Sequence, residues 1–299
     1  MTRLKRLNLL LLFSLLLFSA CKKDHISDEE IIIHPDPVVI VNASVYGQVL
    51  NSSGSPLPNA SVRISTEEVF TDQNGVFIFN DVEMKESGEL IRAEKDGYFY
   101  NAKFVRPQLN KKSIVKLQLI QKTLSGSFTA ASGGSISTNG NAKVTFPANA
   151  IKTQSGDPYN GNVNVYATWL DPTAQSTLLT MPGDLRGTNQ EDQQVQLTTY
   201  GMMGVELRDD AGQLLNIANG NTATLEMPVP DDLLTNAPAT IPLWYMDEAS
   251  GYWVEEGTAT LQDGKYVGFV SHFSFWNCDV PEDFIDLTGT VMSEGGPVA

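Results

Sequence analysis

The sequence VYGQVLNSSGSPLPNASVRI, residues 45–64, contains two short runs of alternating side chains on either side of a turn-rich segment. Alternation with a period of two is the pattern of a half-buried β-strand. Within the segment between the runs, Gly54 can adopt a positive φ and Pro56 can fix the first position of a turn. The stretch therefore predicts a strand, a turn and a second strand.

The same pattern continues to about residue 120. The runs GVFIFN, IRAEK and SIVKLQLI follow, and turn residues such as those of TDQNG separate them. In the last run, Val115, Leu117 and Leu119 fall on one face of an extended backbone, and polar side chains alternate with them. Several short strands at this spacing predict a small β-sandwich.

Three segments of this region, VYGQVLNSSGSPLPNASVRI, TDQNGVFIF and EKDGYF, resemble in sequence and order the carboxypeptidase regulatory-like domain. The resemblance implies a transthyretin-like, seven-stranded β-sandwich over residues 38–121 that acts as a non-catalytic module. The sequence contains no HxxE zinc motif of the carboxypeptidase catalytic domain, so the resemblance does not extend to the peptidase. We expect neither a metal site nor a cofactor.

Residues 122–281 again consist of strand and turn patterns. Val163, Val165, Ala167 and Trp169 share one face of an extended run. GGSISTNGNAKVTFPANAI and GDPYNGNVNVYATWLDP are similar to the ZU-type domain, and IPLWYMDEASGYWVEEG and VSHFSFWN resemble the closing strands of cartilage intermediate layer proteins. These resemblances imply a second, larger β-sandwich, so the expected fold class is all-β. The polar junction between the two domains is expected to be sensitive to proteases.

The last fourteen residues, DLTGTVMSEGGPVA, repeat an earlier phrase. Residues 288–291 (TGTV) echo residues 46–49 (YGQV), and residues 296–298 (GPV) echo residues 55–57 (SPL). A repeat of a strand–turn unit this far downstream predicts that residues 282–299 begin a second regulatory-like domain. Because this repeat is incomplete, we expect the sequence to be a fragment of a longer protein.

The chain begins with MTRLKRLNLLLLFSLLLFSAC, in which basic residues precede an apolar run too short to span a bilayer. This pattern predicts a signal peptide over residues 1–20. FSAC resembles a bacterial lipobox, although Phe18 stands where that motif usually has leucine. The resemblance implies that Cys21 carries lipid as the mature N-terminus. The alternative is an ordinary signal peptide followed by a chance cysteine.

Residues 21–37 have no helical period and contain several acidic residues and prolines, which favours a solvated tether. Lys22 follows Cys21 where aspartate would resemble an inner-membrane retention signal, so sorting to the outer membrane is expected. Residues 27–30, SDEE, resemble the acidic signal that sends some lipoproteins of the Bacteroidetes group to the cell surface. A linker that is merely soluble is the alternative.

The whole chain has a formal net charge of −15, and removal of a signal carrying three basic and no acidic residues leaves −18. Such a chain repels phosphate backbones, so nucleic acid is not an expected partner. The sequence has two cysteines. If Cys21 is acylated, Cys278 has no intramolecular partner, and the fold depends on its cores rather than on disulfides.

His272 is the one histidine outside the tether and lies in the motif HFS. The alternation of residues 265–276 predicts an extended backbone with His272 and Ser274 on the same side. HFS resembles the site at which some ZU-type proteins cleave themselves. That resemblance implies attack of Ser274 on the carbonyl of Phe273, with His272 assisting removal of the hydroxyl proton. The structural alternative is the end of a strand.

Four aromatic residues flank a charged turn at residues 241–257: Trp244, Tyr245, Tyr252 and Trp253. Exposed rings of this kind could stack on a sugar, which makes these residues the candidates for a binding site. The alternative is an aromatic core with a tyrosine at the sheet edge.

These features together favour a non-enzymatic, lipid-anchored protein of the outer membrane or cell surface. Its β-sandwiches are expected to act as spacers and as adhesion modules that bind a surface glycan or a protein. The membrane is the expected partner through the lipid on Cys21. The alternative function is a self-processing module that cleaves between Phe273 and Ser274.

Replacement of Cys21 by serine is expected to leave the protein uncleaved or to release it from the membrane, because the thiol is the site of acylation. Fractionation of cells that produce the wild type or the Cys21→Ser variant measures this. A variant that still fractionated as a mature membrane lipoprotein would show that the anchor assignment is wrong.

Overall fold

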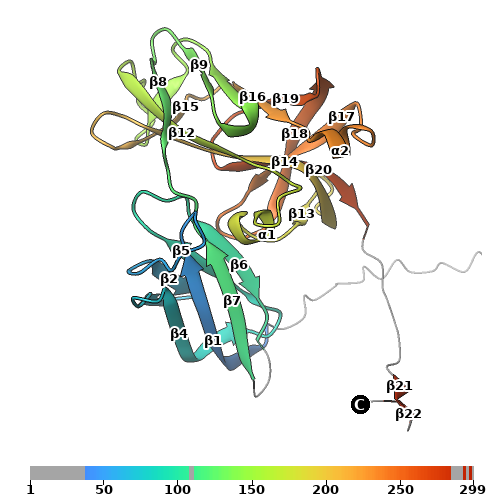
Figure 1. Cartoon of the computed structure of the whole chain (residues 1–299). Helices are drawn as coiled ribbons and strands as arrows, with labels where there is room; N and C mark the ends of the chain where they lie inside the picture. The colour runs from blue at the N-terminus through green and yellow to red at the C-terminus, as the bar shows by residue number, and fades with distance from the viewer. Residues whose placement is uncertain (1–37, 108–110, 284–291, 294–295, 298–299) are drawn as a thin grey trace, which may run out of the picture. The chain divides into compact units, whose positions relative to one another are not determined.

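The computed structural model describes residues 38–107, 111–283, 292–293 and 296–297 (Figure 1). The predicted signal peptide, Cys21, the tether and most of residues 282–299 lie outside the described residues. The described residues all belong to one compact unit. Strands dominate it, and its helical segments are short: η1 (Asn139–Asn141), α1 (Thr177–Thr180) and α2 (Asp231–Leu234). The predicted all-β fold class is confirmed.

The first lobe, residues 38–121, contains seven strands in two sheets. One sheet has the order β4 (Val76–Lys85), β1 (Ile40–Leu50), β7 (Lys112–Gln118). The other has the order β3 (Glu67–Phe70), β2 (Ser61–Ile64), β5 (Glu89–Glu94), β6 (Asn101–Val105). Strands β1 and β7 run parallel, and the other neighbours are antiparallel. Val115, Leu117 and Leu119 are all buried between the sheets, as the alternation predicted.

The TDQNG turn between β3 and β4 shows why the sequence folds as predicted here. A carboxylate oxygen of Asp72 accepts hydrogen bonds from the backbone N–H groups of Asn74 (2.9 Å) and Val76 (2.8 Å). Gly75 has a φ of +69°, and a Cβ atom there would lie 2.3 Å from the carbonyl oxygen of Val49. Only glycine meets both conditions, so the turn fixes how β4 returns to β1.

The second lobe, residues 122–283, contains thirteen strands in one sheet. The main path is β11–β15–β14–β20–β17–β18–β19–β16–β10–β9, while β8, β12 and β13 join it at its sides. The strands are β8 (Leu124–Thr129), β9 (Gly134–Ser137), β10 (Lys143–Phe146), β11 (Ile151–Thr153), β12 (Asn162–Leu170), β13 (Arg186–Thr188), β14 (Gln194–Arg208), β15 (Leu214–Ile217), β16 (Ala223–Pro228), β17 (Thr240–Met246), β18 (Trp253–Gln262), β19 (Lys265–Val270) and β20 (Phe275–Glu282). A small hairpin, β21 (Met292–Ser293) with β22 (Gly296–Pro297), follows.

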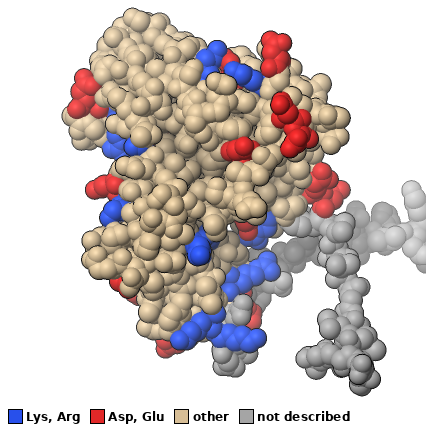
Figure 2. Space-filling model, viewed as in Figure 1, with Lys and Arg blue, Asp and Glu red and all other residues tan. Residues whose placement is uncertain are grey.

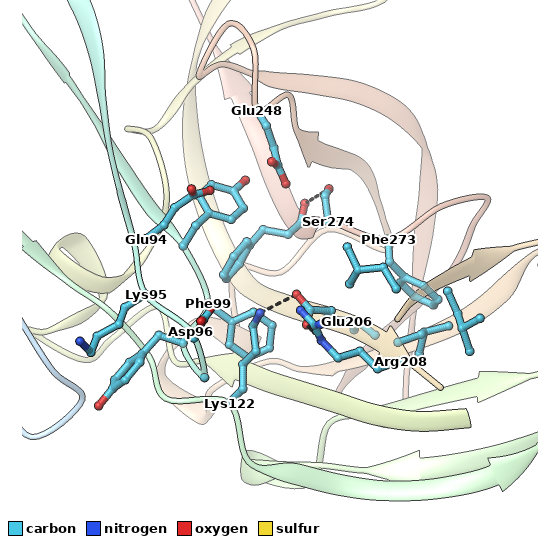
Figure 3. Close-up of a pocket in the computed structure, with 18 of the residues that line it drawn as sticks. Glu94, Lys95, Asp96, Phe99, Lys122, Glu206, Arg208, Glu248, Phe273 and Ser274 are labelled. Atoms are coloured by element: carbon cyan, nitrogen blue, oxygen red, sulfur yellow. Dashed lines mark hydrogen bonds and ion pairs between the residues drawn. The ribbon is translucent and has the colours of Figure 1, made fainter. Parts of the chain in front are cut away.

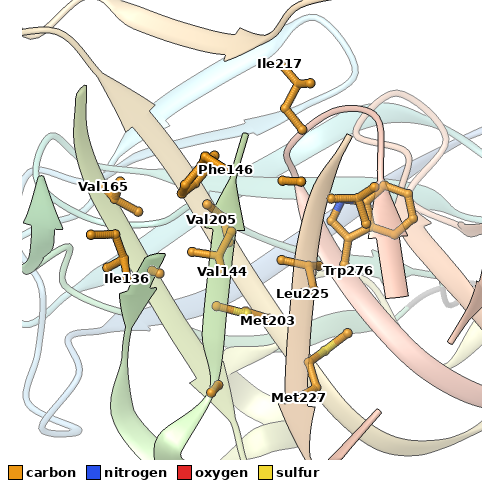
Figure 4. Close-up of a cluster of buried hydrophobic side chains, with 14 of the residues drawn as sticks. Ile136, Val144, Phe146, Val165, Met203, Val205, Ile217, Leu225, Met227 and Trp276 are labelled. Atoms are coloured by element: carbon orange, nitrogen blue, oxygen red, sulfur yellow. The ribbon is translucent and has the colours of Figure 1, made fainter. Parts of the chain in front are cut away.

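The sheet of the second lobe curls over its own apolar face, so that distant strands share one core (Figure 4). Val144 and Leu225 from β10 and β16 belong to the same buried cluster as Val165 and Val205 from β12 and β14. The alternation predicted for residues 163–169 is confirmed, because the side chains of Val163, Val165 and Ala167 are buried in this core, with Trp169 packed against it.

Strands β14, β17 and β20 each contain a stretch that is buried on both faces. Met203 and Trp276 face the core just described, whereas their chain neighbours Met202 and Phe275 face a separate cluster, here called the joint core. Its members are Phe99, Leu170, Met181, Val195, Leu197, Met202, Trp244, Met246, Trp253 and Phe275. Phe99 belongs to the first lobe, and its ring meets that of Phe275 edge to face at a centroid distance of 5.7 Å. The joint core therefore unites the two lobes.

The polar junction expected to be protease-sensitive is tied to the first lobe by backbone hydrogen bonds. The N–H of Phe99 donates to the carbonyl of Ile120 (2.8 Å), and the N–H of Lys122 donates to the carbonyl of Gly97 (2.7 Å). The side chain of Ile120 packs against the joint core. Backbone held in this way is a poor protease substrate, so the junction is part of the connection between the lobes rather than a free linker.

Polar contacts add to the joint. The ammonium group of Lys103 on β6 donates to the backbone carbonyls of Leu178 (2.8 Å), Met181 (2.8 Å) and Gly183 (3.0 Å) around α1. Burial lowers the pKa of Lys103 to about 8. Asn101 donates from the same strand to the carbonyl of Leu179 (2.7 Å). The carbonyls of Leu178 and Leu179 belong to α1, and these bonds satisfy groups that a four-residue helix leaves without intrahelical partners.

A carboxyl group lies in the interior beside the joint core. Asp279 on β20 is fully buried, and it accepts a hydrogen bond from the amide of Asn277 (2.5 Å), which in turn accepts one from Thr199 (2.8 Å). Burial raises the pKa of Asp279 well above its usual value. The neutral carboxylic acid is therefore the form that this environment favours.

The Asp279→Asn variant is expected to remove a pH dependence of stability. Because the folded-state pKa of Asp279 is raised, its contribution to stability is full below the unfolded pKa, near 4, and is lost as the pH rises toward the folded value. The variant should therefore melt higher than the wild type at pH 8, by about 2 °C or more for each kcal/mol of relieved cost. Thermal melts at pH 4.5 and pH 8 measure this, and a difference that did not grow with pH would contradict it.

Candidate functional site

A cleft of about 1100 Å³ lies where the two lobes meet (Figure 3). The first lobe contributes Arg92 and residues 94–100, which form the end of β5 and the turn after it, and Lys122 lies at the junction between the lobes. The second lobe contributes β14, β15, the turn that holds Glu248, and residues 273–275. The joint core fixes both walls, because Phe99 and Phe275 belong to the core and also line the cleft.

One wall is organised around Arg92. Its Nε donates to Glu94 at 2.6 Å, and its Nη1 donates to Glu248 of the other lobe at 2.7 Å. The guanidinium lies over the ring of Tyr100, 3.9 Å from the centroid, which adds a cation–π contact. Burial, and then the charge of Glu248, raise the pKa of Tyr100 well above its usual value. This wall therefore combines an inter-lobe ion pair with an aromatic ring.

The other wall is organised around Glu206. Its two carboxylate oxygens accept hydrogen bonds from Lys122 and from Nε of Arg208, each at 2.6 Å, and Figure 3 shows both cations directed at it. The Lys122–Glu206 pair ties the junction that follows the first lobe to β14 of the second lobe. The ammonium group of Lys122 lies 5.5 Å from the centroid of the Phe99 ring. Both walls are thus held by ion pairs between residues far apart in the sequence.

None of the charged residues in the two walls was a candidate in the sequence analysis. Arg92 and Glu248 are separated by 156 positions, and Lys122 and Glu206 by 84. A single Arg or Glu at the end of a strand looks like any solvated residue. The sequence does contain one indication of the site, the EKDGYF segment at residues 94–99, which lines the cleft. In the sequence analysis this segment served only to identify the fold.

The four aromatic candidates do not form a common surface. Trp244 and Trp253 are fully buried in the joint core, so neither presents a ring to a sugar. Tyr252 lies near Phe104, with ring centroids 6.2 Å apart, and Tyr245 lies elsewhere, against His272 and Trp276. Trp244 and Trp253 are therefore corrected as binding candidates, and the alternative of an aromatic core with tyrosines at the edge describes the four residues.

The extended strand expected over residues 265–276 is also corrected. β19 ends at Val270, and β20 begins at Phe275 after a bend. β19 pairs with β16 and β18, whereas β20 pairs with β14 and β17. Residues 271–274 therefore connect two strands that occupy different places in the sheet.

His272 and Ser274 have different partners in this connection. Nε2 of His272 lies 3.5 Å from a carboxylate oxygen of Glu256, and its ring lies 4.7 Å from that of Tyr245. The hydroxyl of Ser274 donates to the carbonyl of Phe275 at 3.0 Å, and Ser274 and Phe273 line the cleft. The structure thus directs the side chain of His272 toward Glu256 rather than toward Ser274.

Two further observations concern metal sites and membrane-spanning helices. Within the residues that the structure describes, no group of three or more His, Cys, Asp or Glu side chains is arranged to hold a metal ion. A search of the same residues found no helix with the length and apolar character needed to cross a membrane.

We expect the peptide bond between Phe273 and Ser274 to stay intact, because the Ser274 hydroxyl is not hydrogen-bonded to the imidazole that would accept its proton. Denaturing mass spectrometry of freshly purified and of incubated protein measures this, with Ser274→Ala as the matched control. Fragments that appeared in the wild type and not in the control would establish self-processing.

No family model matches the chain. It is 29% identical over 127 residues to human cartilage intermediate layer protein 1, which covers 42% of this chain and 10% of that protein. It is 24% identical over 225 residues to mouse cartilage intermediate layer protein 2, which covers 72% of this chain and 19% of that protein. The chain thus spans between a tenth and a fifth of the length of these relatives. The similarity to cartilage intermediate layer proteins is confirmed, whereas the regulatory-like, ZU-type and lipoprotein resemblances stay predictions.

Among solved structures, a protein of unknown function from Bacteroides fragilis matches with a TM-score of 0.23 and 10% identity, over 81% of this chain and 99% of that one. The Bacillus anthracis TIE protein matches with a TM-score of 0.23 and 10% identity, over 85% of this chain and 47% of that one.

Proposed function

We propose that the chain is a non-enzymatic binding protein, held at the bacterial cell surface by lipid on Cys21, and that its ligand occupies the cleft between the two lobes. The observation that carries the proposal is the cleft itself, a concave site of about 1100 Å³ with walls from both lobes. Binding sites favour such junctions, because two surfaces there can enclose a ligand that neither could hold alone.

The way the walls are built favours binding. Arg92 is paired with Glu248 in one wall, and Lys122 is paired with Glu206 in the other. These pairs and the joint core beneath them hold the site in one arrangement before a ligand arrives. A preformed site loses little conformational entropy on binding.

The charged groups of the cleft favour binding over catalysis. A carboxylate oxygen of Glu248 lies 2.7 Å from Nη1 of Arg92, and one of Glu206 lies 2.6 Å from Nζ of Lys122. General acid–base chemistry instead requires a group free to exchange a proton with the substrate. Groups engaged in ion pairs serve better as fixed donors and acceptors for a ligand that leaves unchanged.

Anchorage on Cys21 would give such a module a defined role. A lipid on that residue, followed by the acidic segment up to residue 37, would hold the binding lobes near the membrane and free to meet a ligand outside it. A glycan or a secreted protein is the ligand class that fits this position.

Filling the cleft should abolish binding. Asp96 is exposed and lines the cleft, so the Asp96→Trp variant should place an indole in the space where the ligand lies. Glu191 is an exposed turn residue outside the cleft lining, so Glu191→Trp is the matched control. Arrays of oligosaccharides and of secreted proteins, probed with the chain from Lys22 onward, should show at least about tenfold weaker binding for Asp96→Trp alone.

Equal binding by both variants would place the ligand site outside the cleft. Conversion of any array ligand to a product by the wild type would contradict the non-enzymatic assignment.

A further inference from the structure

The cleft is nearly neutral on an acidic protein. Its lining contains five cationic and four acidic side chains: Arg92, Lys95, Lys122, Lys152 and Arg208, with Glu94, Asp96, Glu206 and Glu248. The second lobe as a whole has six lysines and arginines against nineteen acidic residues, a net of −13. Figure 2 shows acidic side chains spread over this lobe. The cleft thus departs from the charge of the surface around it, and its near neutrality provides little long-range attraction for a charged ligand.

The cations of the cleft also have partners already. Arg92 is engaged with Glu94 and Glu248, and Glu206 is shared between two cations. The ammonium groups of Lys95 and Lys152 donate to the carbonyl of Pro58 (2.7 Å) and to the amide oxygen of Asn219 (2.6 Å). A charged ligand would have to compete with these pairs, and breaking a partly buried ion pair is costly.

Hydrogen-bonding capacity remains even though the charges are balanced. Each carboxylate offers about four acceptor positions and each guanidinium five N–H donors. Arg92 uses its Nε and Nη1, and Arg208 likewise uses its Nε and Nη1, which leaves further N–H groups on both. Donors and acceptors that stand side by side suit ligand hydroxyl groups, because a hydroxyl both donates and accepts.

An exposed aromatic ring borders the same cleft. Phe70 on β3 is 64% exposed, and it is the one strongly exposed large apolar side chain, among the described residues, that lines the cleft. The C–H face of a pyranose ring is apolar and packs flat on such a ring, which would cover surface that otherwise faces water. Phe269 is also 64% exposed and lies on a strand, but it lies outside the cleft lining.

We infer that the cleft binds a neutral oligosaccharide, with Phe70 stacking on one sugar ring and the Arg92–Glu248 and Lys122–Glu206–Arg208 groups bonding its hydroxyls. This inference rests on the proposed function and specifies its ligand. The cleft volume of about 1100 Å³ exceeds the range of about 300–1000 Å³ that suits a drug-sized molecule. The site therefore has room for more than one sugar unit.

The test is isothermal titration calorimetry of the chain from Lys22 onward. Cellohexaose, xylohexaose and mannohexaose are the neutral probes, hexagalacturonate is the anionic probe, and the chitosan hexamer is the cationic probe. At least one neutral hexasaccharide should bind, and its Kd should change less than about twofold between 50 mM and 500 mM NaCl, because no net charge is screened.

Two matched variants assign the aromatic contact. Phe70→Ala should weaken binding of the neutral hexasaccharide about tenfold or more, because it removes the ring on which the apolar face of the sugar packs. Phe269→Ala should bind like the wild type. Both variants should keep the wild-type melting temperature within about 2 °C, because both side chains are largely exposed.

Three results would overturn the inference. The first is equal affinity of Phe70→Ala and the wild type. The second is binding of only the anionic or the cationic hexamer, with an affinity that falls steeply with salt. The third is the absence of binding by all neutral probes. If Asp96→Trp still abolished binding of a charged sugar or of a protein in the second or third case, the cleft would stand as the binding site while the neutral ligand class would not.

Discussion

The contact between Phe99 and the inner strands of the second lobe is the interaction on which the rest of the structure depends. β14, β17 and β20 carry large apolar side chains on both faces, and the sheet covers only one of these faces by curling over itself. The other face includes Phe275, whose ring packs edge to face against the rings of Phe99 and Tyr100 from the first lobe. Burial of such surface stabilises by about 25 cal/mol for each Å². The first lobe therefore completes the core of the second.

This constraint also explains why the cleft has the form that it has. The joint core fixes the position of one lobe against the other. The cleft residues next to this core therefore face one another whatever their chemistry. Arg92 meets Glu248 and Lys122 meets Glu206 as a result, and each pair removes the cost of a lone charge near a partly buried surface. The joint core thus determines which polar residues face one another in the cleft. The same arrangement holds their hydrogen-bond donors and acceptors in fixed positions.

Much of the fold could be predicted from local patterns, because strands with one buried face alternate in sequence. Val115, Leu117 and Leu119 are an example, and the Asp72 turn is another. Runs such as GMMGV and FWNC do not alternate, which is typical of strands buried on both faces. Such a run does not indicate which residues cover the second face of the strand. The packing of Phe99 against β20 could therefore not be predicted from the sequence.

The site could be predicted less well, for two physical reasons. The pair of Arg92 and Glu248 arises from packing between lobes, and no local pattern encodes a contact across 156 positions. The HFS motif was interpreted on the assumption of one continuous strand, but the chain bends at residues 271–274 so that β20 can enter the sheet beside β14. Tertiary pairing overrode the alternation there.

The parallel pairing of β1 with β7 has a mechanical consequence. Residues 44–50 of β1 pair in register with residues 112–118 of β7. A tensile load that enters through the start of β1 and leaves through the end of β7 pulls two parallel neighbours in opposite directions along their length. The whole ladder then bears the load in shear, and its bonds must fail together rather than open one after another from an end. A force applied between these two points would therefore pass through the first lobe without unravelling β1 from its start.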